Sequence, residues 1–175
     1  SLNVKEGQEE LGDVELPNNV KIGWFPETAK VTLTAIPSEG CKFVKWSDNN
    51  TENPRIITIG NQNIELTAEF AWADGVTAYP IWIGNKQIHS QRLVMNNATN
   101  PYISMGSITY DPQTRTLLLD NLNVESSVGS TLVIGDKDKQ ESAIKVVLKG
   151  TNIITAYADG AILTQNVDVS FEGYG

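Results

Sequence analysis

A chain of 175 residues can form one large domain or two modules of roughly 70 to 100 residues each. Its formal net charge is −8 and its 13 lysines and arginines are scattered, which argues against nucleic-acid binding, since that needs clustered cations. With 40% hydrophobic and 19% charged residues, the chain can bury a core. No run of 18 apolar residues predicts membrane insertion, no export signal is recognised, and the single cysteine, Cys41, excludes an intrachain disulfide.

The first part of the chain reads as an all-β module with one apolar face. Apolar and polar residues alternate, as in half-buried strands, and strands are expected at 20–24, 31–35, 41–46, 55–59 and 64–70, the last two as a pair. Trp24 and Trp46 are expected in the core. Phe43 and Trp46 are three residues apart, so both can face the core only if a bulge or twist intervenes.

A set of residues in this part carries a resemblance to a known family. They are 31–35, Pro37, 39–40, Phe43, 46–48, 53–54 and 66–70. Residues 2–72 resemble the divergent internalin-type B-repeat of bacterial surface proteins. The resemblance implies an extracellular stalk or spacer without catalytic residues. We therefore expect a B-repeat-like module at 1–74 and a second module at 75–175.

The second module is expected to begin with two hairpins. Residues 79–83 and 86–88 flank Gly84 and Asn85, which favour a tight turn. Residues 107–110 and 116–119 flank a turn that contains Pro112. A polar loop is expected between them at 91–101. These hairpins predict a cap at the start of the module.

A strand pattern then occurs three times, at 117–121, 146–150 and 169–173. Self-similarity of this spacing predicts stacked rungs of a parallel β-helix, a solenoid. Aligning the copies puts Asp120, Lys149 and Glu172 in one column, which predicts a solvated ladder of alternating charge. The last copy lacks a polar cap, so the solenoid is expected to be truncated there or covered by another subunit, with self-association through the open rung.

A second resemblance covers residues 76–175 and rests on 79–85, 106–112, 117–121 and 148–154. These are similar to modules of exported proteins from gut and soil bacteria, some of them labelled carbohydrate-binding. The resemblance implies a β-hairpin cap that leads into a right-handed β-helix. It implies no particular ligand residues.

Candidate catalytic and metal-binding residues are few. The acids on or beside the rungs are Asp120, Asp159, Asp168 and Glu172, and glycosidases and lyases would need two of them about 5 to 10 Å apart. We interpret them as ladder residues and His89, the single histidine, as a surface residue. The loop from Asp136 to Glu141 has three carboxylates, but two lysines alternate with them. We therefore expect it to be a loop that only connects two rungs, and a calcium-binding site is the alternative.

Trp82 is the candidate glycan contact. Ile81 and Ile83 flank it and face the other way, so its ring is either covered or available to stack on a sugar.

The sequence thus predicts a non-enzymatic fragment of a bacterial cell-surface or secreted protein, a spacer joined to an adhesion or carbohydrate-binding module. No catalytic residue, cofactor or metal is expected, and a glycan or a host or cell-surface protein is the expected partner. The alternative is part of a β-helix carbohydrate-active enzyme, a polysaccharide lyase or glycosidase, with its active site beyond residue 175. A purely structural spacer is a third hypothesis.

Overall fold

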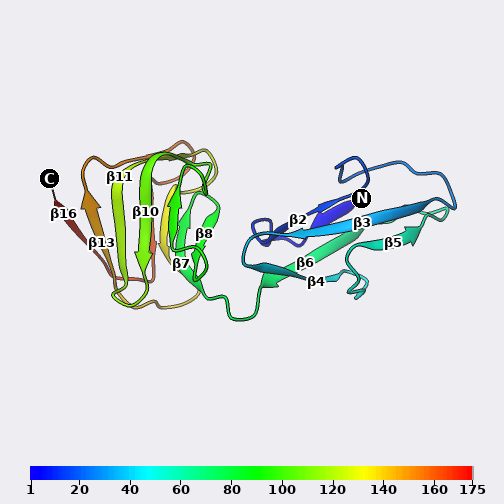
Figure 1. Cartoon of the computed structure of the whole chain (residues 1–175), viewed down its shortest axis with the longest axis horizontal. Coiled ribbons are helices and arrows are strands. Elements are labelled where there is room, and N and C mark those ends of the chain that lie inside the picture. The colour runs from blue at the N-terminus through cyan, green and yellow to red at the C-terminus, as the bar shows by residue number, and fades with distance from the viewer. Residues whose placement is uncertain (175) are drawn as a thin grey trace. The chain divides into compact units, whose positions relative to one another are not determined.

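The computed structural model describes residues 1–174, with only the backbone of Tyr174, and every regular element in this range is a β-strand. The prediction of an all-β protein is therefore confirmed. The described residues contain no helix that could cross a membrane. The chain separates into two compact units, Ser1–Val76 and a second unit that begins at Thr77. Figure 1 labels the strands of both units.

Unit 1 contains two three-stranded sheets. One has the order β1-β6-β4 and consists of β1 (Leu2–Val4), β6 (Leu66–Trp72) and β4 (Cys41–Trp46). The other has the order β2-β3-β5 and consists of β2 (Gly12–Glu15), β3 (Lys30–Pro37) and β5 (Arg55–Thr58). Only β1 and β6 pair in parallel; the other pairs are antiparallel.

The core of unit 1 follows the period-2 alternation of the sequence. Its buried members on β3 and β6 are Val31, Leu33, Ala35, Leu66, Ala68 and Phe70. Trp46 is fully buried, and its indole Nε1 donates to the carbonyl of Glu52 at 3.0 Å. The register of β4 against β6 shifts between Phe43 and Lys45. The ring centroids of Phe43 and Trp46 lie 5.3 Å apart. The predicted bulge is therefore confirmed.

Two predictions for unit 1 are wrong. Residues 20–24 form no strand, and Ile22 and Trp24 are 71% and 94% exposed. Strands β5 and β6 are not partners, because β5 pairs with β3 while β6 lies between β1 and β4. The sequence pattern missed β1 and β2, whose backbone groups occupy the pairing positions on β6 and β3.

Unit 2 also contains two sheets. The four-stranded sheet has the order β15-β12-β7-β8, with β7 (Ala78–Ile83), β8 (Lys86–His89), β12 (Leu132–Gly135) and β15 (Ile162–Gln165). The six-stranded sheet runs β16-β13-β11-β10-β9, with β9 (Val94–Asn96), β10 (Ile103–Asp111), β11 (Thr116–Ser126), β13 (Ile144–Lys149) and β16 (Val169–Tyr174). Strand β14 (Ile153–Ala156) pairs with the second half of β11. Both predicted hairpins are present, β7 with β8 and β10 with β11, whereas β9 lies in the expected loop at 91–101.

Unit 2 contains several parallel strand pairs, and the sequence separation between paired residues is similar from one pair to the next. Strand β11 pairs with β13, Leu117 beside Val146, and β12 pairs with β15, Leu132 beside Ile162. The chain thus passes from one sheet to the other and back while adding parallel neighbours to both sheets (Figure 1). The core between the sheets includes Ile81, Ile108, Leu119, Ile134 and Val146, all at most 1% exposed.

The register of β16 differs from the prediction by two residues. Ile144, not Val146, lies beside Val169, so Glu172 lies beside Val147. A shift of two residues leaves every side chain on the same face of the strand, so the apolar pattern cannot distinguish the two registers. The predicted pairing of Asp120 with Lys149 is confirmed.

Candidate functional site

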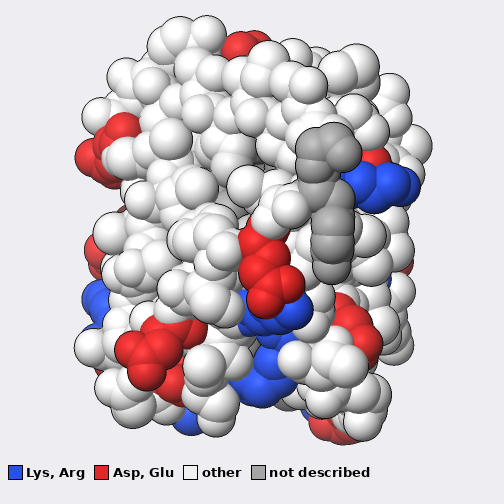
Figure 2. All heavy atoms as spheres, turned by 90° about the vertical axis from the view of Figure 1, so that its left-hand side faces the viewer, with Lys and Arg blue, Asp and Glu red and all other residues white. Residues whose placement is uncertain are grey.

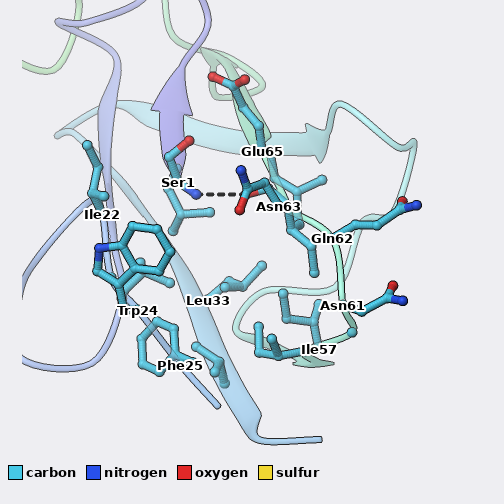
Figure 3. A pocket seen from close by; sticks show the side chains of 18 residues that line it. Ser1, Ile22, Trp24, Phe25, Leu33, Ile57, Asn61, Gln62, Asn63 and Glu65 are labelled. Carbon is cyan, nitrogen blue, oxygen red and sulfur yellow. Dashed lines mark hydrogen bonds between the residues drawn. The ribbon is translucent and has the colours of Figure 1, made fainter. Parts of the chain in front are cut away.

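A cleft of about 550 Å³ opens in unit 1, where segments from both of its sheets meet. Core residues such as Leu33 form its floor, and residues 22–25 and 60–65 form its sides. Figure 3 shows Trp24 and Phe25 on one side, Asn61 and Gln62 on the other, and Leu33 between them. Its volume lies within the range of roughly 300 to 1,000 Å³ that is usual for small-molecule sites.

The segment that carries Trp24 is held at both ends. Leu16 and Val20 form an isolated antiparallel bridge, and the backbone N–H of Leu2 donates to the carbonyl of Lys21 at 2.8 Å. At the other end, the N–H of Thr28 donates to the carbonyl of Ile59 at 2.8 Å. The segment therefore runs along the cleft without pairing as a strand.

Gly23 allows the aromatic side of the cleft to form. A β-carbon at Gly23 would lie 2.7 Å from Cε2 of Phe25, so the Phe25 ring packs directly against the glycine backbone. Phe25 is half-buried and contributes to the edge of the core, while Trp24, its neighbour, is exposed. Gly23 and Pro26 were the signals in the sequence that could have predicted a loop here instead of a core strand.

Few charges line the cleft. Glu65 lines it, and its carboxylate accepts a hydrogen bond from the Asn3 amide at 2.7 Å. The charged amino group of Ser1 also lines it and donates to the carbonyl of Ile64 at 2.7 Å. Within residues 1–174, no hydrogen bond to protein engages the side chains of Asn61, Gln62 and Asn63. The cleft therefore offers aromatic surface, whereas the carboxamides of Asn61 and Gln62 point outward, away from Trp24 (Figure 3).

Trp82, the residue that the sequence singled out, lies in a row of side chains across the four-stranded sheet of unit 2. The strand registers place Gln87, Trp82, Val133 and Leu163 side by side, and we call these residues the Trp82 row. Ile81 and Ile83 are buried on the opposite face of β7, so the row faces away from the core. Trp82 and Val133 are half-buried and Leu163 is 38% exposed.

The acids on the rungs form ion pairs with lysines. The Nζ of Lys149 lies 2.8 Å from the Asp120 carboxylate, and that of Lys145 lies 2.7 Å from Glu172. The hydrogen bond from Lys149 holds the pKa of Asp120 below its usual value. Glu172 thus pairs with Lys145, not with Lys149 as the predicted column implies. The arrangement matches a solvated ladder, with neighbours of opposite sign.

The remaining acids do not gather into a site. Asp159 and Asp168 are exposed and lie outside the strands. In the loop from Asp136 to Glu141, the Asp136 carboxylate accepts from the N–H of Asp138 at 2.9 Å, and Lys139 lies 2.9 Å from Glu141. Among the described residues, no group of three or more acidic, histidine or cysteine side chains could hold a metal ion.

His89 is fully buried, so its predicted surface position is wrong. Ile88, its neighbour on β8, is also fully buried, so β8 is covered on both faces at this end. The chain folds back on His89: the N–H of Arg92 donates to the carbonyl of His89 at 2.8 Å. The chain turns directly after β8, which alternation alone cannot reveal.

Part of unit 1 matches a known domain family. Residues 22–74 match the divergent InlB B-repeat domain, which confirms the resemblance predicted for the N-terminal part. This family occurs in bacterial surface proteins, which is consistent with a cell-surface or extracellular location. No curated protein and no solved structure matched the chain. The resemblance of the second unit to carbohydrate-binding modules stays a prediction.

Proposed function

We propose that the chain is a non-enzymatic part of a bacterial cell-surface or secreted protein, in which unit 1 serves as a spacer and unit 2 presents an adhesive, glycan-binding surface. The observation that carries the proposal is the match of residues 22–74 to the B-repeat domain. Repeats of this kind are consistent with a stalk. The proposal of an adhesive surface rests on unit 2.

The Trp82 row is the proposed glycan contact. It combines an indole with the side chains of Val133 and Leu163 on a regular sheet, which keeps the contact surface rigid. Aromatic rings of this kind offer a large apolar face with a polar N–H at the edge. A sugar that lies along the row would cover the ring and reach Oε1 of Gln87, whose Nε2 already donates to the carbonyl of Tyr79 at 2.8 Å.

The absence of catalysis is part of the proposal. It is supported by the ion pairs of Asp120 and Glu172 with lysines and by the exposed loop positions of Asp159 and Asp168. General acid–base chemistry needs carboxyl groups that converge on one bond and whose pKa values are tuned apart. The pKa of Asp120 is lowered, which is the direction unsuited to a general acid.

We further propose that unit 2 is built as a short parallel solenoid behind its hairpins. Three pairings support this: β11 with β13 at a shift of 29 residues, β12 with β15 at a shift of 30, and β13 with β16 at a shift of 25. Similar shifts in both sheets are expected when each circuit of the chain stacks on the one before.

The end of unit 2 that bears β15 and β16 is the proposed surface for self-association. Phe171 lies beside the buried Val146 but is 50% exposed, and Ile162 lies beside the buried Leu132 but is 39% exposed. Figure 2 looks onto this end, where uncharged side chains cover the upper part and charges lie lower down and at the margin. Unpaired strand edges with apolar side chains favour pairing with another chain. Sedimentation over a concentration series tests this: pairing that Phe171→Asp abolishes supports it, and a monomer at all concentrations contradicts it.

A glycan array tests the main proposal. We expect the chain to bind at least one glycan without releasing reducing ends or unsaturated sugars, and we expect Trp82→Ala to abolish that binding. Ile56→Ala is the control, because Ile56 is an apolar side chain of unit 1 that is 65% exposed. Turnover of a bound glycan, or a blank array for the unsubstituted chain, would contradict the proposal.

A further inference from the structure

The face of the four-stranded sheet that carries the Trp82 row has no charged side chain. Strands β7, β12 and β15 contain no lysine, arginine, aspartate or glutamate. The one such residue of β8, Lys86, lies beside the buried Ile83, on the side of the sheet that faces the core. The six-stranded sheet, by contrast, carries ion pairs such as that of Asp120 with Lys149. Depletion of charge together with an aromatic side chain is typical of the centre of a contact surface.

The lack of charge limits the ligand in both directions. A carboxylate or sulfate group that left water to lie against this face would meet no lysine or arginine of the four strands. An ammonium group would likewise meet no carboxylate of these strands. Covering an ion without a counter-ion costs free energy, because the lost hydration is not replaced. The face therefore favours an uncharged ligand over an acidic or a basic one.

The apolar side chains of the row define a direction. Trp82, Val133 and Leu163 lie at the same register of three neighbouring strands, so the line through them runs across the strands. Neighbouring strands are about 4.8 Å apart, which is close to the length of one sugar ring in an extended β-linked glycan. Successive rings can therefore lie over successive side chains, with their axial C–H groups removed from water. An α-linked chain of the maltose type curves, so its rings would leave the row.

The small size of the row favours a narrow ligand over a protein. Trp82 and Val133 are half-buried and Leu163 is 38% exposed. Together they expose only a small part of the roughly 800 Å² that each partner contributes to a stable protein interface. A single glycan chain needs no more than the width of one such row.

We propose that the Trp82 row binds an uncharged, extended β-linked glycan of the cellulose, mannan or xylan type, which crosses the strands with three successive sugar rings over Trp82, Val133 and Leu163. This ligand class rests on the proposed function, in which the row contacts a glycan, and adds the charge, the direction and the length of the bound chain.

Calorimetric titration of the full chain with oligosaccharides of increasing length tests the proposal. The probes are the di-, tri- and tetrasaccharides of the cellulose, β-mannan and β-xylan series, with maltotetraose as the curved and tetragalacturonate as the acidic comparison. In at least one series, we expect the trisaccharide to bind about tenfold or more tightly than the disaccharide. The tetrasaccharide should add less than about threefold, because its fourth ring lies beyond the row.

Two aspartate substitutions on β15 locate the end of the bound chain. Leu163→Asp puts a charge at the end of the row and should lower the affinity for the trisaccharide to that for the disaccharide. Binding of the disaccharide by this variant shows that it is folded. Thr164→Asp is the matched control, because Thr164 is exposed on the same strand but lies beside Ile134, whose side chain faces the core. It should bind the trisaccharide as the unsubstituted chain does.

The outcomes separate this ligand class from the proposed function. Equal affinities for disaccharide and trisaccharide, full trisaccharide binding by Leu163→Asp, or tighter binding of maltotetraose or tetragalacturonate would overturn the ligand class and leave glycan binding standing. The same holds if no β-linked probe binds but the glycan array shows another saccharide. A blank array, or saccharide binding that Trp82→Ala leaves unchanged, would overturn both.

A protein occupant gives a different result. If sedimentation shows self-association that Trp82→Ala abolishes and Phe171→Asp retains, a second copy of the chain covers this face, and the assignment of a β-linked glycan is overturned.

Discussion

Replacement of Gly135 by alanine tests the parallel contact between β12 and β15. Gly135 lies beside Gln165 at the end of this pair and has a φ of +100°. A β-carbon there would lie 1.9 Å from the carbonyl oxygen of Gln165 and 2.7 Å from Cγ1 of Val167. Both distances are far below the roughly 3.5 to 4.0 Å at which nonbonded atoms pack best.

The expected loss of stability has two parts. A positive φ at a residue with a side chain costs about 1 to 3 kcal/mol. The contact with Gln165 is with backbone, so β15 must move, and weakening of its pairing with β12 adds a further loss of about 1 to 3 kcal/mol, as for other overpacking changes. Gly135→Ala should therefore destabilise unit 2 by about 2 to 6 kcal/mol.

Gly129→Ala is the matched control. Gly129 also has a positive φ, +61°, but the nearest atom to its added β-carbon is Oδ2 of Asp159 at 3.8 Å. It should show the backbone cost alone, about 1 to 2 kcal/mol. Urea unfolding followed by circular dichroism measures both, with one transition allowed for each unit. Equal losses in the two variants would refute the close approach of β12 and β15.

Three further substitutions probe other contacts. Asn53→Asp should destabilise unit 1 by about 1 to 3 kcal/mol in urea unfolding, because the Asn53 amide donates to the carbonyl of Ala35 at 2.7 Å and accepts from its N–H at 2.8 Å. Leu119→Ala should destabilise unit 2 by about 2 to 5 kcal/mol in the same assay, since Leu119 is fully buried. Asp120→Asn should lower the melting temperature at pH 7 but not near pH 2. The pKa of Asp120 is held low by Lys149, so the ionic contribution is present above about pH 4 and is lost as the pH falls through the folded-state value.

Controls for these variants come from neighbouring positions. Asn61→Asp changes an exposed amide of unit 1 and should be close to neutral. Leu118→Ala changes a half-buried side chain on the other face of β11 and should cost less than Leu119→Ala. If Leu118→Ala costs more, the assigned faces of β11 are wrong. If the effect of Asp120→Asn persists at pH 2, its ion pair is not the cause.

Local sequence patterns predicted many of the strands and many of the residues that are buried in the cores. Alternation around Leu33 and Phe70 identified β3, β6 and their inward faces, because successive side chains in a strand point to opposite sides. Gly84, whose φ is +59°, and Pro112 marked turns at which hairpins form. The repeat of apolar triplets also predicted the shift of 29 residues between β11 and β13.

Features of the sites were harder to predict. Trp24 shares its alternation with core residues, and its exposure results from the way Leu2 and Ile59 hold the segment to either side. His89 looks like a surface residue by type, and its burial results from a turn back to Arg92. For Trp24, contacts with distant segments decided the exposure of the side chain, whereas for His89 a local turn did.

The sequence by itself determined that this protein is all-β, where most of its strands and turns lie and which face of each long strand is apolar, because these depend on residues next to one another in the chain. The tertiary structure decided which strands are neighbours, the two-residue difference in the register of β16 and the opening of a cleft beside Trp24. These features depend on which of several distant segments forms hydrogen bonds with a given strand, as β1 does with β6. A period of two leaves such choices open, since several partners and registers keep the same side chains inside.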